Sequence, residues 1–306
     1  MPRLLPVLLA VLLTSGCGSP AQGAGILATT PLWAEITSAT ACGRPVESLM
    51  PVGTDPHSFE PSLADRGRLD ATLLLVANGG NLEEGLEDTL SATPTFVHYI
   101  VSNDDASEYH DDDTHHDDDT HHDDDTHHDD DTSDPHIWLD PVSVADSLPA
   151  LAEALSAHAG LDPVSVEACR RELDARLRLL DRDIGDRLAT IPDARRVLVT
   201  DHAMLGHFAD RYDLEVAETV LRSHSSMAQP SAHDLELLAE EMSDQGVAVV
   251  AIEETGRNAD SRRLAEHTGA TIVEIPLRLG PEGSPTGTYE GMLRILAERL
   301  DDALRG

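Results

Sequence analysis

Three histidines lie in similar local settings although they are far apart in the chain. His57 ends the run Gly-Thr-Asp-Pro-His, His136 ends the run Asp-Pro-His, and His202 directly follows an aspartate. Neutral imidazoles that converge on one cleft favour zinc, whose nitrogen ligands lie at about 2.0–2.1 Å. A single histidine is more often a structural hydrogen-bonding residue than a ligand, and spacing alone does not group these three. From the residues themselves, a three-histidine metal site and three structural histidines are both open.

Two carboxylates are candidates for a further ligand position. Glu253 stands at the end of a predicted buried strand, and Glu274 lies in a later one. Each could instead be a solvated side chain at a strand end or a helix cap, and water could complete a tetrahedral zinc site without either. A zinc hydrolase with Glu253 as its base is the enzymatic alternative. The sequence has no His-Glu-x-x-His pattern, so we expect a binding protein and not an enzyme.

Residues 104–134 form a tract of a different kind. The unit Asp-Asp-Asp-Thr-His-His repeats three times between Asp111 and His128. With almost no apolar side chains the tract cannot offset its chain entropy, so we expect it to be disordered. Its imidazoles could bind metal weakly and raise the zinc concentration near a cleft; the alternative is a neutral product of repeat slippage. The histidines concerned are His110, His115, His116, His121, His122, His127 and His128.

The charge balance of the chain excludes several classes of protein. The 306 residues carry a formal net charge of −36, and all 21 basic side chains are arginine. Binding to nucleic acid through a basic surface is excluded, because phosphate affinity requires cationic neutralisation. The absence of lysine excludes Schiff-base enzymes and phosphate-loop nucleotide binding.

The elements that must position these residues alternate between strand and helix patterns. The predicted strands cover 26–28, 46–50, 73–77, 196–200, 247–252 and 271–275. The predicted helices cover 31–41, 62–70, 142–159, 162–190, 203–212, 231–244, 259–268 and 288–304. Such alternation indicates an α/β fold with parallel sheets.

We expect two parallel-sheet lobes joined by one long rigid helix. The predicted N-terminal lobe covers 24–160, the linking helix 161–191 and the C-terminal lobe 192–306. Ligands of parallel sheets bind outside the carboxyl ends of the strands. His57 and His202 fall at such ends and His136 enters from a neighbouring loop, so the predicted metal site lies in the cleft between the lobes. One stiff helix would limit hinge closure.

The N-terminus predicts export. Residues 1–17 combine Arg3, a ten-residue apolar run and Ser-Gly-Cys17, which is similar to a signal peptide ending at a lipoprotein cleavage site. We expect lipidation at Cys17 and anchoring at the cell surface or in the periplasm. The alternative is cleavage after Gly23, which gives a soluble exported protein.

If the protein is exported and Cys17 is lipidated, two further cysteines remain in the mature chain, Cys42 and Cys169. In an oxidising compartment, one interpretation is that they form a disulfide. Two small buried apolar residues are the other interpretation. Neither cysteine belongs to a Cys-x-x-Cys pattern, which argues against a cysteine zinc site.

Four motifs in order carry a family resemblance across the mature chain. They are 53–62 (GTDPHSFEPS), Asn78-Gly79 with Leu82-Glu83, 134–141 (DPHIWLDP) and 202–214 (HAMLGHFADRYDL), with 229–231 and Thr288-Tyr289 in agreement. Together they closely resemble the zinc-binding solute receptors of ABC importers, the cluster A-I family that includes the ZnuA and AztC types.

The resemblance implies a metal site between two lobes, with His57, His136 and His202 as ligands. Manganese-type members place a glutamate where this chain has His202, so the resemblance implies Zn²⁺, with Mn²⁺ less favoured. Many relatives carry an aspartate about a dozen residues before the terminal tyrosine motif. Here that position is Leu277, which cannot coordinate, so water, Glu253 and Glu274 stay open as the fourth ligand.

The implied function is an extracytoplasmic, high-affinity zinc receptor, acting as a monomer. It would deliver its ion to an ABC permease and its ATPase, held at the membrane by the N-terminal lipid. The alternative is a surface metal buffer or adhesin-like lipoprotein without a dedicated transport role.

Overall fold

A computed structural model describes residues 25–101, 134–221 and 223–306 of the chain. The predicted export signal with Cys17 and the seven histidines of the acidic tract lie outside the described residues.

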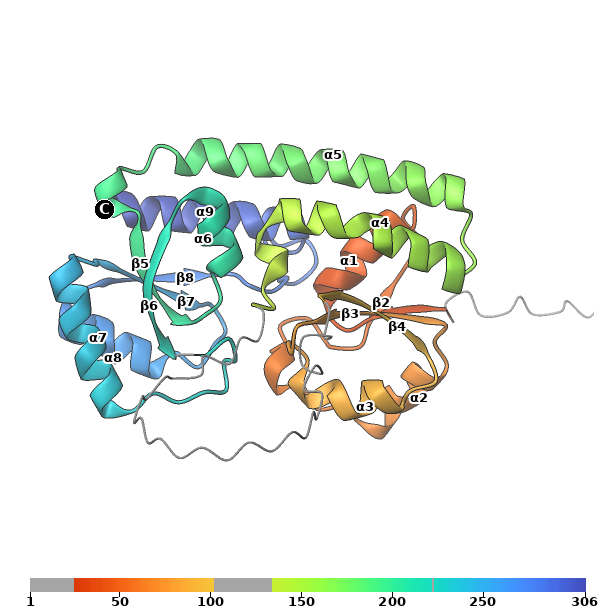
Figure 1. The fold of residues 1–306 in the computed structure, drawn as a ribbon, viewed down its shortest axis with the longest axis horizontal. Helices are drawn as coiled ribbons and strands as arrows, with labels where there is room; N and C mark the ends of the chain where they lie inside the picture. Colours follow the sequence, from red (N-terminus) through yellow and green to blue (C-terminus); the bar gives the residue numbers. More distant parts are fainter. Residues whose placement is uncertain (1–24, 102–133, 222) are drawn as a thin grey trace, which may run out of the picture.

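The first sheet has four parallel strands in the order β2-β1-β3-β4. Its strands are β1 (Ile26–Ala28), β2 (Glu47–Ser48), β3 (Leu74–Gly79) and β4 (Phe96–Val101). Helices α1 (Pro31–Thr40) and α4 (Pro141–His158) cover one face, and α2 (Leu63–Asp70) and α3 (Glu87–Ala92) cover the other (Figure 1). Successive strand residues point to opposite faces. Ile26 and Ala28 accordingly pack under α1 and α4, while Leu27 packs with residues of α2 and α3.

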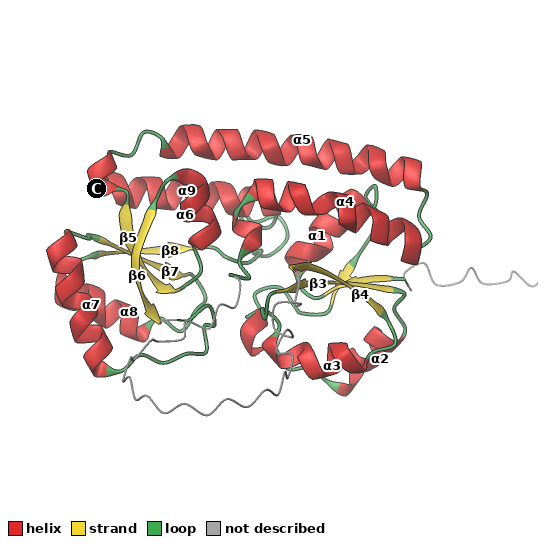
Figure 2. Cartoon of the chain, viewed as in Figure 1, coloured by secondary structure: helices red, strands yellow, loops and turns green. Residues whose placement is uncertain are grey.

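The second sheet repeats this plan with the order β6-β5-β7-β8. Its strands are β5 (Val197–His202), β6 (Glu215–Leu221), β7 (Val249–Glu253) and β8 (Thr271–Ile275). Helices α6 (Gly206–Tyr212) and α9 (Tyr289–Arg305) lie on one side, and α7 (Ala232–Gln245) and α8 (Ala259–Thr268) lie on the other (Figure 2). The carboxyl ends of β5 and β7 face the first sheet's loops, which is where a ligand site of a parallel sheet is expected.

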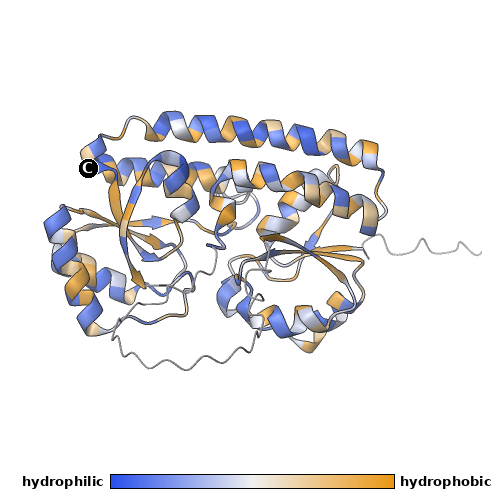
Figure 3. Ribbon diagram, in the orientation of Figure 1, coloured by the Kyte–Doolittle hydropathy of each residue, from blue (hydrophilic) through white to orange (hydrophobic). Residues whose placement is uncertain are grey.

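Helix α5 (Pro163–Leu188) spans both sheets (Figure 1). Its 26 residues give a length of about 39 Å at 1.5 Å per residue. Asp162 caps its first turn, accepting a hydrogen bond from the Ser165 N–H at 3.0 Å. Hydrophilic and hydrophobic residues alternate along the helix (Figure 3), and its buried side belongs to the same apolar core as α1, α4 and α9. The predicted fold of two parallel-sheet lobes joined by a long helix is therefore confirmed.

Two strands were not predicted from the sequence, and both lie at the edge of a sheet. β4 and β6 each pair with one neighbour only, and most of their residues are partly exposed. An edge strand carries mixed polar and apolar residues, so it lacks the continuous apolar run that marked β3 and β7. The predicted strand at 46–50 is also shorter, reduced to Glu47–Ser48 at the opposite edge.

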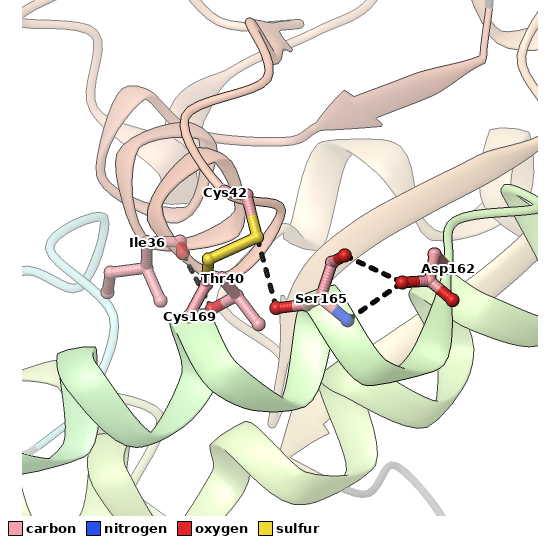
Figure 4. The surroundings of a disulfide bond; sticks show 6 residues. All are labelled: Ile36, Thr40, Cys42, Asp162, Ser165 and Cys169. Atoms are coloured by element: carbon pink, nitrogen blue, oxygen red, sulfur yellow. Dashed lines mark hydrogen bonds between the residues drawn. A yellow bond between two sulfur atoms is a disulfide. The ribbon is translucent and has the colours of Figure 1, made fainter.

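A disulfide joins Cys42, in the turn after α1, to Cys169 in the first half of α5 (Figure 4). The two Cα atoms lie 5.4 Å apart across a sequence separation of 127. The bond ties the first helix of the N-terminal sheet to the long helix. Within residues 25–101, 134–221 and 223–306, no helix has the length and apolar character needed to cross a bilayer.

Candidate metal centre

The fold brings His57, His136 and His202 together between the two sheets. His57 lies in a short 3-10 turn after β2, His136 directly precedes another such turn, and His202 is the last residue of β5. Their ring centroids are 5.4–6.2 Å apart, and one ligand atom from each lies within 4.8 Å of the others. All three are buried, with exposed fractions of 6%, 1% and 2%. Three buried imidazoles at this separation form a candidate metal site.

The backbone at each histidine is fixed by a nearby aspartate. Asp55 accepts the backbone N–H of His57 at 3.2 Å, and Asp134 accepts that of His136 at 3.0 Å. In both loops a proline separates the two residues, and proline fixes its own φ. The two Asp-Pro-His runs therefore form the same local turn.

Each imidazole also has a carboxylate at its Nδ1 atom. The distances are 3.3 Å from His57 to Glu84, 2.8 Å from His136 to Asp134 and 2.9 Å from His202 to Asp201. A carboxylate at Nδ1 favours the tautomer with the proton on that atom, which leaves the Nε2 lone pair for a metal. The Nε2 atom of His57 is buried and has no hydrogen-bond partner. A metal ion between the rings would satisfy it.

The surroundings set the pKa values of the three rings differently. Burial, together with the adjacent His136 ring, lowers the pKa of His57 to about 3. Burial likewise lowers the pKa of His136. Burial opposes the charge on His202 too, but the hydrogen bond and negative charge of Asp201 outweigh it and raise the pKa of His202. His57 and His136 are thus neutral at neutral pH, the form in which imidazole binds metals.

The two carboxylates predicted as fourth ligands differ sharply in position. Glu253 is buried at the end of β7, but its Oε1 atom lies 2.5 Å from Nε of Arg278. Glu274 is exposed on β8 and pairs with Arg262 at the surface. The structure therefore gives no support to Glu274 as a ligand, because its carboxylate pairs with Arg262 at the surface. Neither glutamate contributes a ligand atom to the group formed by His57, His136 and His202.

Two residues of the site were missed in the sequence. His224 follows the unpredicted strand β6, and with Asp134 and His136 it makes a second group of potential ligand atoms within 4.8 Å. Its Nδ1 atom lies 2.9 Å from the Ala203 carbonyl and 3.6 Å from Asp134. Arg278 follows Leu277, and nothing in its sequence context marked it. Both residues reach the site through tertiary contacts between chain segments, which the sequence alone does not show.

Four hydrogen bonds hold the loops of the two lobes together around His57. The Ser226 hydroxyl donates to Asp55 at 2.7 Å, and Nη1 of Arg278 donates to the Gly53 carbonyl at 3.1 Å. Deeper in the interface, Trp138 Nε1 donates to the Leu277 carbonyl and the Tyr289 hydroxyl donates to the Trp138 carbonyl. The loop that carries His57 is therefore positioned from both lobes.

Similar proteins are known for nearly the whole chain. The manganese-binding lipoprotein MntA of Bacillus subtilis is 25% identical over 98% of this chain and 97% of its own length. The high-affinity zinc uptake system protein ZnuA of Paracoccus denitrificans is 31% identical over 56% of this chain and 52% of its own.

Among solved structures, the periplasmic zinc-binding protein TroA of Treponema pallidum superposes with a TM-score of 0.76 at 22% identity. The match covers 93% of this chain and 100% of TroA, and at this identity it shows a shared fold. The family model described as zinc-uptake complex component A, periplasmic, matches residues 26–303. The chain therefore belongs to this family of substrate-binding receptors of metal ABC transporters, and not to a family of enzymes.

Proposed function

We propose that this protein is an extracytoplasmic receptor that binds Zn²⁺ through Nε2 of His57, His136 and His202 and delivers it to an ABC importer. The observation that carries the proposal is the convergence of three buried imidazoles, each with a carboxylate at Nδ1. A permease and its ATPase would receive the ion, which is cargo and not a resident cofactor.

The donor set supports zinc over manganese. Imidazole suits zinc, whereas manganese prefers carboxylate, carbonyl and water oxygens. The group of convergent ligand atoms formed by His57, His136 and His202 contains no carboxylate. Relatives do not decide the metal by themselves, because MntA is named as a manganese protein and TroA and ZnuA as zinc proteins.

Attachment to the membrane is proposed through the N-terminus. Residues 1–17 have the pattern of an export signal ending at Cys17, and MntA is itself named a lipoprotein. A lipid at Cys17 would keep a monomeric receptor close to its permease.

The Asp/His tract is proposed as an auxiliary store of weakly bound zinc. The described residues at its two ends belong to the N-terminal lobe: Val101 ends β4, and Asp134 lies beside His136. A segment with many weak ligands there would raise the local ion concentration without forming the tight site. If the tract held all of the bound metal, the protein would instead be a surface metal buffer.

A chelator-competed titration of apo-protein lacking residues 1–17, with and without 104–133, tests this function. Trp138 lies with its ring centroid 5.2 Å from that of His136 and supplies a fluorescence signal. We expect one tight zinc site that survives the deletion, several weak sites that are lost with it, and much weaker Mn²⁺ binding. Loss of all tight binding with the tract would overturn the receptor, and a tighter site for Mn²⁺ would overturn the zinc assignment.

A further inference from the structure

Arg278 is a partly buried cation beside the proposed zinc site, and the three histidines do not explain its presence. Its side chain is 14% exposed. Nε and Nη2 both lie 2.5 Å from Oε1 of Glu253, and Nη1 donates to the Gly53 carbonyl of the loop that carries His57. A positive charge at this place opposes the binding of a second cation, so its presence requires a reason.

Glu253, the partner of Arg278, lies next to His202. Strands β5 and β7 pair Val199 with Val250 and Thr200 with Ala251, and two residues after this pair the two strands end at His202 and Glu253. Paired residues of neighbouring strands are about 4.8 Å apart and project from the same face of the sheet. The Glu253 N–H also donates to Asp201, the carboxylate that holds the His202 ring.

We propose that Arg278 holds the Glu253 carboxylate out of the zinc coordination sphere and so keeps the fourth position open to water. The inference rests on the proposed function, because it takes the three histidines as the zinc ligands. Arg278 acts here as a positioning residue through Glu253. Among the described residues it is the cation that pairs with this buried carboxylate, and a buried carboxylate requires a positive partner.

The consequence concerns release of the ion. Without the guanidinium, the nearest compensating charge for Glu253 would be the zinc ion itself. A carboxylate ligand would replace a neutral water and strengthen binding, since coordination number and ligand charge set metal affinity. The Arg278–Glu253 pair therefore lowers the affinity for zinc and keeps the fourth coordination position exchangeable. A permease can take the metal through that position.

The test uses a double-mutant cycle on the full mature chain, with zinc release followed after addition of excess chelator. We expect Arg278→Gln to slow release about 10-fold or more, since even an outer-shell partner changes metal affinity by about 10–100-fold. Arg278→Gln combined with Glu253→Gln should release zinc within about threefold of the wild type, because the amide adds no charged ligand. Arg299→Gln is the matched control: it removes the same charge from an exposed pair with Glu254, the next residue along, and should leave release unchanged.

A second measurement includes a test on the wild-type protein alone. Wild-type protein loaded with Co²⁺ in place of zinc should enhance the relaxation of water protons through one exchangeable bound water, and Arg278→Gln should lose this enhancement. The inference is overturned if wild-type Co²⁺ protein shows no such water, or if a folded Arg278→Gln releases zinc at the wild-type rate or faster. Absence of tight zinc binding in the wild type would instead overturn the proposed function.

Discussion

The two lobes contribute to the metal centre through different kinds of structure. His202 ends β5, a central strand flanked by β6 and β7, and its Nδ1 partner Asp201 is the preceding residue in the same strand. His57 lies in a loop turn, and its Nδ1 partner Glu84 comes from another loop at 3.3 Å with a side chain that is 33% exposed. One imidazole is thus fixed by the sheet and the other by loops.

The difference indicates which half of the site is preorganised. A residue in a central strand cannot shift without breaking ladder hydrogen bonds, whereas loop residues open at much lower free energy. We therefore expect the C-terminal half of the site to keep its geometry without metal. The loop residues of the N-terminal half should move first when the ion enters or leaves.

The largest expected effects come from removing the histidines themselves. His202→Ala and His57→Ala should each weaken zinc binding by roughly 100-fold or more, since loss of a ligand exceeds the 10–100-fold cost of losing an outer-shell partner. The two should differ in the stability of the apo-protein: His202→Ala leaves the buried Asp201 without its ring partner and should lower the melting temperature, while His57→Ala should change it little.

Chelator competition and thermal unfolding measure these two effects, with the exposed His267→Ala as the control. Retention of tight binding by either variant would contradict the three-histidine site. Equal melting temperatures for the two would contradict the difference between the lobes.

The next effects in size concern the carboxylates at Nδ1. Asp201→Asn should weaken zinc binding by about 10–100-fold, because the buried carboxylate fixes the ring and its tautomer. Glu84→Gln should weaken zinc binding by less than about 5-fold, since a partner at 3.3 Å that is one-third exposed contributes little in competition with water. Competition titrations at one pH compare the two, and a larger loss in Glu84→Gln would reverse the assignment of the rigid half.

The smallest expected effect on the metal comes from the disulfide. Replacing Cys42 and Cys169 with serine should leave zinc affinity within about twofold, because the bond lies between α1 and α5 and touches no ligand. Unfolding of the apo-protein should become easier by about 2–5 kcal/mol, as expected for a cross-link that closes a long loop. Urea unfolding under oxidising conditions measures this, and a large loss of zinc affinity would show that α1 positions the site.

The sequence predicts the centre of this molecule better than its edges. Continuous apolar runs marked β3 and β7, whereas β4 and β6, at the sheet edges, carry mixed residues and gave no such signal. His136 and His202 have their carboxylates within two residues in the chain, so the sequence already contains those pairs. Glu84 and Arg278 approach the site only through tertiary packing.

Glu274 shows a further limit of sequence reasoning. It lies one residue before Ile275, which pairs with Glu253 across β7 and β8, so it projects from the opposite face of the sheet. Helices cover both faces of a parallel sheet. The sequence pattern therefore does not show from which face a side chain would reach the cleft.

Zinc-edge X-ray absorption on tract-deleted protein carrying one equivalent of Zn²⁺ is the most direct test of the three-histidine centre. A three-histidine centre predicts three imidazole nitrogens at about 2.0–2.1 Å and one further oxygen. It also predicts loss of one imidazole contribution in His202→Ala. A first shell dominated by oxygen, or one unchanged in His202→Ala, would contradict the three-histidine centre.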